Sequence, residues 1–153
     1  MTTKQWSVLQ DFDITGESGD LRYQVRGNFS FTQTLSITEP TGKRTAQITR
    51  TPFTTRHQVI IDGQQVAQVQ HQFMGWNTCT ADSVHGQFVA QGSFAGWQYT
   101  IRHGDQVVAS MSKQGILPSS FEVDTADGQD DLLLLCLVLA IEEIHRERSK
   151  RRR

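Results

Sequence analysis

The chain lacks most features that mark secreted, membrane-spanning and linker-rich proteins. Its 153 residues include only two cysteines and three prolines, so neither a disulfide framework nor a proline-rich linker is expected. No apolar run approaches the roughly 20 residues of a transmembrane helix. Residues 1–10 have no apolar stretch typical of a secretion signal. Myristoylation and prenylation signals are also lacking. We therefore expect a cytoplasmic protein without a transmembrane span.

Catalytic and cofactor-binding motifs are lacking as well. The sequence has no phosphate-binding loop of the Walker type and no dinucleotide fingerprint. Its five histidines lack the close spacing of zinc ligands. Cys79 would serve as a nucleophile only if folding brought it to His71 or His85, and an ordinary strand cysteine is the simpler interpretation. The sequence therefore predicts no enzyme, no catalytic residue, no metal and no cofactor.

The most informative segment that is present runs from Leu132 to Ile141 and is apolar throughout. A helix that is apolar on every face has to be covered by protein or lipid. Ten residues of helix are about 15 Å long, too short for a bilayer. We therefore predict a core helix over about residues 130–146, buried in the protein.

Aspartates precede this helix at positions 124, 127, 130 and 131. A calcium loop aligned on Asp127-Gly128 would place Val123 first and Leu134 twelfth, and neither residue type binds calcium there. Helix capping explains the pattern better, because an aspartate at the start of a helix accepts bonds from free amides and complements the positive helix end.

The rest of the chain alternates apolar and polar residues in short runs separated by turn residues such as Asp62-Gly63. We expect strands over Trp6–Ile14, Leu21–Asn28, Thr34–Thr38, Arg44–Thr51, Arg56–Ile61, Gln65–Gln72, Asn77–Ala81, Gln87–Gln91, Gly96–Arg102, Gln106–Ser112 and Phe121–Asp124. Related units follow the glycines at 42, 63 and 104, which favours an antiparallel meander. Closing so many strands into a barrel would remove exposed edges, and the apolar helix would fill the interior.

Three features together resemble the LURP-one-related family of the tubby C-terminal-like superfamily, which also includes phospholipid scramblases. They are Ile37-Thr38-Glu39-Pro40-Thr41-Gly42, the Gly-x-x-Val-Ala units, and the stretch from Val123 to Leu135 with Ala140-Ile141 after it. The resemblance implies a mainly β domain: a closed antiparallel barrel of about 12 strands around a hydrophobic C-terminal helix, with no established enzymatic activity. Tubby domains bind phosphoinositides through basic residues, but this chain has no matching basic motif. It also lacks scramblase-like cysteine-rich and proline-rich segments.

Charge is spread unevenly along the chain. The net charge is −1, but residues 146–153 carry +5 and the other residues −6, which points to an anionic partner for the tail. We expect one domain over residues 1–148 and a flexible basic tail over 147–153. The candidate lipid-binding residues are Arg146, Arg148, Lys150, Arg151, Arg152 and Arg153. A solvated tail without a partner is the alternative.

Two further questions stay open at the level of sequence. The first question is whether the basic residues before the tail form one surface patch in the fold. These residues are Arg22, Arg26, Lys43, Arg44, Arg50, Arg56 and Arg102. Trp6, Trp76 and Trp97 are either core residues, which we favour, or membrane-interface anchors. The partner is then an anionic phospholipid at a membrane surface or another protein; nucleic acid is disfavoured, and the oligomeric state is not indicated.

Overall fold

The computed structural model describes the backbone of residues 3–9, 13–28, 34–51, 56–71, 78–93, 98–112 and 120–151. Within these ranges the chain is mainly β, with one C-terminal helix. The strands are β1 (Thr3–Leu9), β2 (Asp13–Thr15), β3 (Leu21–Asn28), β4 (Thr34–Thr38), β5 (Thr45–Arg50), β6 (His57–Ile61), β7 (Gln64–His71), β8 (Thr78–Ser83), β9 (Gly86–Ser93), β10 (Gln98–His103), β11 (Gln106–Ser112) and β12 (Ser120–Ala126). The helix α1 spans Asp131–Arg151.

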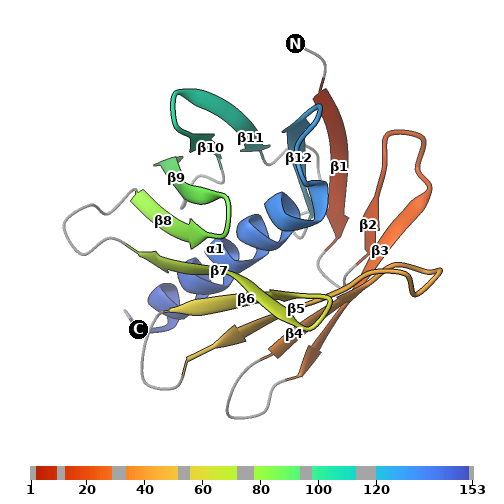
Figure 1. The fold of residues 1–153 in the computed structure, drawn as a ribbon, viewed down its shortest axis with the longest axis horizontal. Helices are drawn as coiled ribbons and strands as arrows, with labels where there is room; N and C mark the ends of the chain where they lie inside the picture. The colour runs from red at the N-terminus through yellow and green to blue at the C-terminus, as the bar shows by residue number, and fades with distance from the viewer. Residues whose placement is uncertain are drawn as a thin grey trace.

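The strands form one antiparallel sheet in which neighbours in sequence are neighbours in space, as the meander prediction requires. The first and last strands also meet, because β1 pairs with β12 over the full length of both. On its other side β1 pairs with β2 through only two residue pairs, Ser7 with Thr15 and Val8 with Ile14. The sheet thereby curves around α1, which runs through the space between the strands (Figure 1).

Sequence periodicity located most strands to within two residues, and β3, β4 and β11 have the predicted bounds. The single strand predicted over Trp6–Ile14 is wrong, because β1 ends at Leu9 and β2 begins at Asp13. Trp6 and Ile14 are both buried, so apolar residues recur at even positions on both sides of the break. Alternation alone therefore does not reveal where the chain reverses.

Alternate residues of each strand face the helix and form the core. In β6 the inward residues are His57, Val59 and Ile61, and in β4 they are Leu35 and Ile37. The hairpin between β6 and β7 turns at Asp62-Gly63, where both residues have positive φ angles of 52° and 83°. Such a two-residue turn matches the twist of the paired strands, which confirms the turn predicted from this dipeptide.

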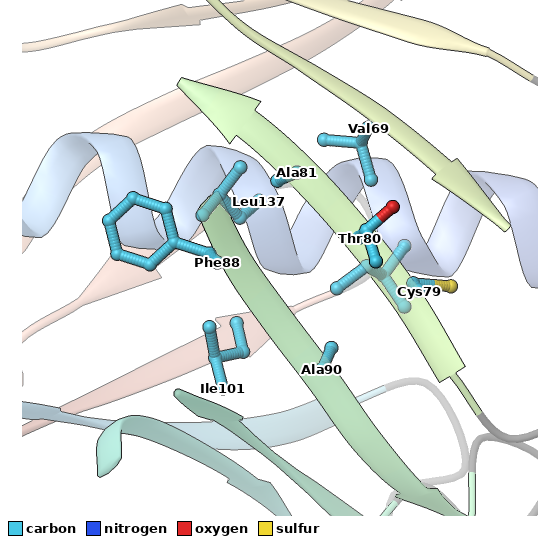
Figure 2. A pocket seen from close by; sticks show the side chains of 9 residues that line it. Val69, Cys79, Thr80, Ala81, Phe88, Ala90, Ile101 and Leu137 are labelled. Atoms are coloured by element: carbon cyan, nitrogen blue, oxygen red, sulfur yellow. The ribbon is translucent and has the colours of Figure 1, made fainter. Parts of the chain in front are cut away.

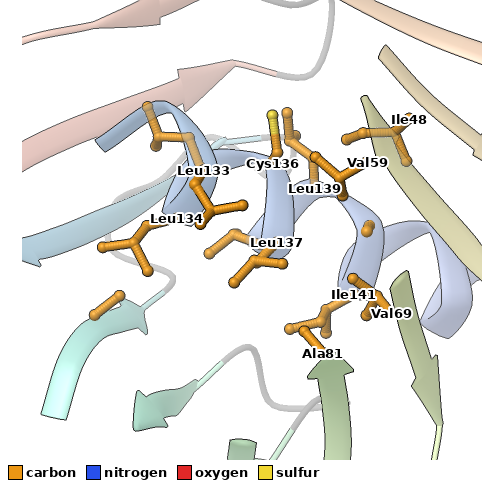
Figure 3. Close-up of a cluster of buried hydrophobic side chains, with 14 of the residues drawn as sticks. Ile48, Val59, Val69, Ala81, Leu133, Leu134, Cys136, Leu137, Leu139 and Ile141 are labelled. Atoms are coloured by element: carbon orange, nitrogen blue, oxygen red, sulfur yellow. The ribbon is translucent and has the colours of Figure 1, made fainter. Parts of the chain in front are cut away.

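The helix is buried on every side, as its sequence predicts. All residues from Leu132 to Glu142 are buried, and so is Ile144. Figure 3 shows leucines on opposite faces of the helix pointing toward different strands, with Ile48, Val59, Val69 and Ala81 among the residues that meet them. The helix backbone continues to Arg151, five residues beyond the predicted end at 146.

The direction of α1 distinguishes two ends of the sheet. At the helix-start end, tight turns join β2 to β3, β4 to β5, β6 to β7, β8 to β9 and β10 to β11, and residues 127–130 lead into α1. At the helix-exit end, residues 10–12, 29–33, 51–56, 72–77, 94–97 and 113–119 join the other strand pairs. Successive connections lie at opposite ends of the sheet because consecutive strands are antiparallel.

Candidate functional site at the exit of the central helix

The start of the helix is fixed by aspartates, as the sequence predicted. The Leu133 amide donates to Asp130 Oδ1 at 3.3 Å, and the Leu134 amide donates to the Asp130 carbonyl at 3.1 Å. Asp130 is therefore the N-cap, where its side chain satisfies an amide that has no partner within the helix. Arg44 Nη1 lies 3.6 Å from Asp130 Oδ1, and Arg44 Nε lies 3.5 Å from Asp62 Oδ2.

A second chain of hydrogen bonds ties the helix start to the first and last strands. Trp6 Nε1 donates to Thr125 Oγ1 at 3.0 Å, and Thr125 Oγ1 donates to Asp131 Oδ1 at 3.0 Å. Trp6 and Thr125 are buried, so Trp6 is a core residue, as we favoured. Within the described residues no group of three or more metal-binding side chains comes together. Asp130 caps the helix and lies near Arg44, and Asp131 accepts a hydrogen bond from Thr125.

Described residues of the helix and of strands β7–β10 enclose a small cavity beside Leu137 and Ile141 of α1. The centre of a water-sized sphere can occupy only about 10 Å³ of it, which is room for about one water. Figure 2 shows Val69, Phe88, Ala90 and Ile101 around it, with Cys79 and Thr80 as neighbouring polar residues. A space of this size suits core packing and does not accommodate a ligand such as a lipid.

The structure places His71 directly opposite Cys79 in the β7–β8 ladder, a proximity that the sequence did not indicate. The side chain of His71 lies outside the described residues. Cys79 is only 2% exposed and lines the small cavity, so its thiol faces the packed core. Cys136 is fully buried, and burial, with the Asp130 carboxylate adding to it, raises the pKa of its thiol far above the usual range. A protonated thiol is a poor nucleophile.

One polar contact holds the later part of the helix. Tyr99 on β10 donates its hydroxyl proton to Glu142 Oε1 at 3.2 Å, and both residues are buried. Burial, together with the nearby Glu142 carboxylate, raises the pKa of Tyr99 well above its usual value, so the phenol stays a donor. Gly92 on β9 allows β10 to approach closely, because a Cβ atom at position 92 would lie 2.6 Å from Tyr99 Cα. Residues 43 positions apart share this contact, which no local sequence pattern could have indicated.

Helix α1 leaves the core after Ile144, which is 1% exposed, and His145 is half-buried. The seven residues from there to Arg151 add about 10 Å of helix at the helix-exit end. The predicted tail residues Arg146, Arg148, Lys150 and Arg151 lie on this helical backbone, although their side chains are outside the described residues. Arg152 and Arg153 lie wholly outside them.

The other basic residues do not gather on one face. Arg22, Lys43, Arg44 and Arg102 lie at the helix-start end, whereas Arg50 and Arg56 flank a connection at the helix-exit end. Arg26 lies within β3, at neither end of that strand. Arg22 is also engaged locally: its guanidinium lies 3.6 Å from Asp20 and 5.5 Å from the centre of the Trp6 ring. Arg50 continues the inward face of β5, is half-buried and stands opposite His57 on β6. These basic residues therefore do not form one surface patch, because they are divided between the two ends of the sheet.

Comparison with known proteins assigns the chain to a family. The family model described as LURP-one-related matches residues 1–142, a range that includes every strand of the sheet and the first half of the helix. A search of curated proteins found no match for the chain. No helix within the described residues combines the length and hydropathy needed to cross a bilayer.

Proposed function

Since the chain belongs to the LURP-one-related family, we propose that it is a non-enzymatic, cytoplasmic domain that binds anionic phospholipid head groups at a membrane surface. In this proposal the sheet is a closed, tubby-like barrel that holds the helix rigidly. The pairing of β1 with both β12 and β2 supports closure, and the burial of α1 on all sides from Leu132 to Glu142 favours a ligand that binds outside the sheet.

The observation that carries the proposal is the position of the basic tail. Six of the eight residues from 146 to 153 are basic, and they follow directly on the buried helix. Because the helical backbone continues to Arg151, these charges emerge together at one end of the domain. Basic residues at a helix C-terminus also complement the helix dipole, but that effect is confined to the last turn and does not call for the residues beyond Arg151.

The expected strength of the interaction follows from the number of charges. A basic residue near an anionic membrane contributes about 1 kcal/mol. The run from Lys150 to Arg153 therefore supplies about 4 kcal/mol, which corresponds to dissociation constants of about 1 mM. Tail binding alone is thus reversible, and stable attachment needs a second contact from the domain or from a partner.

Sedimentation with vesicles tests the proposal. Full-length protein should sediment with vesicles that contain phosphatidylserine at low salt, should do so less as salt shortens the screening length, and should stay in solution with phosphatidylcholine alone. A chain ending at Glu147 should bind at least about tenfold more weakly, since five basic residues are lost. A full-length variant with glutamine at Arg148 and at residues 150–153 is the matched control, because it keeps the length of the helix.

Three outcomes would contradict the proposal. Equal sedimentation of the wild-type and glutamine variants would remove the tail as the membrane contact. No binding by either at low salt would favour a protein partner. Tighter binding to an oligonucleotide than to vesicles, with the steep salt dependence of phosphate contacts, would assign the tail to nucleic acid.

A further inference from the structure

The two ends of the domain carry opposite charge. At each end we count the connections and the two residues at that end of every strand, together with residues 127–131 at the helix-start end and residues 142–153 at the helix-exit end. The helix-start end has nine acidic residues and five basic residues, a net charge of −4: Glu17, Asp20, Glu39, Asp62, Asp82, Asp105, Asp127, Asp130 and Asp131 against Lys4, Arg22, Lys43, Arg44 and Arg102. The helix-exit end has nine basic and five acidic residues, a net charge of +4.

Helix capping and the helix dipole account for only part of this separation. They explain Asp127, Asp130 and Asp131 at the start of α1 and the basic residues in its last turn. They do not explain Glu17, Asp82 or Asp105, which lie in or beside hairpin turns of other strands and are exposed. The charge separation is therefore a property of the whole domain along the axis of the helix.

From this charge separation we infer that the domain meets an anionic membrane end-on, with the helix-exit end toward the lipid and the helix-start end toward water. This orientation rests on the proposed function. The 21 residues of α1 span about 31 Å, several times the screening length of about 8 Å at physiological salt. In the end-on orientation the acidic end is therefore outside the range of repulsion by the membrane. In a reversed or sideways orientation acidic residues would face the anionic head groups.

Fluorophores attached at the two ends distinguish these orientations. Gln98, the first residue of β10, is exposed at the helix-exit end. Val84, in the β8–β9 turn, is 67% exposed at the helix-start end. Cysteine at either position would carry an environment-sensitive label, and the native Cys79 and Cys136 are buried. Wild-type protein treated with the same reagent measures labelling of these native thiols, and melting curves of the labelled variants show whether each folds as the wild type does.

Vesicles containing phosphatidylserine should shift the emission of the Gln98→Cys label to shorter wavelength, and a quencher carried by the lipid should reduce it. The Val84→Cys label should keep its emission in both experiments. If vesicles sediment the protein but the Val84→Cys label responds as strongly as the Gln98→Cys label, the orientation is wrong and the proposed function stands. If neither labelled protein sediments with the vesicles while both are folded, the proposed function fails and the orientation fails with it.

Discussion

Leu137 provides the most direct test of the buried helix. Its side chain is 1% exposed and lies between the helix and β7–β10, beside the small cavity (Figure 2). Leu137→Ala would extend that cavity, and the rigid sheet around it limits how far the structure can relax. Replacements of this kind in well-packed cores cost about 3–5 kcal/mol. For a chain of 153 residues this lowers the melting temperature by about 6–20 °C.

Thermal unfolding followed by circular dichroism would measure the change, with two matched controls. Leu137→Met nearly conserves side-chain volume and should cost less than about 1.5 kcal/mol. Val84→Ala removes methyl groups from a residue that is 67% exposed and should change stability by less than about 0.5 kcal/mol. If Leu137→Ala and Val84→Ala lowered the melting temperature equally and slightly, the helix would not be packed inside the sheet.

Two further predictions concern acidic residues. Asp130→Ala removes the N-cap bond to the Leu133 amide and should lower the free energy of unfolding by about 1 kcal/mol; millimolar calcium should leave the wild-type melting temperature unchanged, and an increase of several degrees would point to a metal site. Asp124→Asn should raise the melting temperature at neutral pH. Burial, with Glu122 and Glu17 nearby, raises the pKa of Asp124. The folded state therefore binds the proton of Asp124 more tightly than the unfolded state does. The stability that this proton provides is lost as pH rises through the folded-state pKa. The difference between wild type and Asp124→Asn should disappear at pH values below the usual aspartate range, and a difference that persisted there would contradict this explanation.

Local patterns in the sequence were sufficient for the main elements of the fold. An apolar helix flanked by charges and a series of alternating runs between turns both depend on neighbouring residues, so the helix, its aspartate cap and most strand bounds could be predicted. The break between β1 and β2 could not, because Trp6, Val8 and Ile14 all occupy even positions, and the single irregularity at Leu9-Gln10 does not by itself indicate a reversal of the chain. The end of the helix was placed too early because basic residues alone do not terminate a helix.

Contacts between distant residues were outside the reach of such patterns. The bond between Trp6 and Thr125 joins residues 119 positions apart, and the bond between Tyr99 and Glu142 joins residues 43 positions apart. The division of charge between the two ends has the same origin. Glu17, Asp82 and Asp105 are scattered along the chain, and they come to one end only because an antiparallel meander returns every second connection to the same side.

The proposed function assigns different parts of the helix to the fold and to the ligand. Up to Ile144 the helix is enclosed, and substitutions there act on packing and hence on stability. Beyond His145 the backbone of the same helix continues through the basic residues to which the proposal assigns lipid binding. Because the sheet fixes the direction of the helix through Asp130 and Asp131 at one end and Glu142 near the other, it also fixes the direction in which the tail leaves. A tail held in this way adds its charge at one defined end of the domain, whereas an equally basic but unattached segment would give the domain no preferred orientation at a membrane.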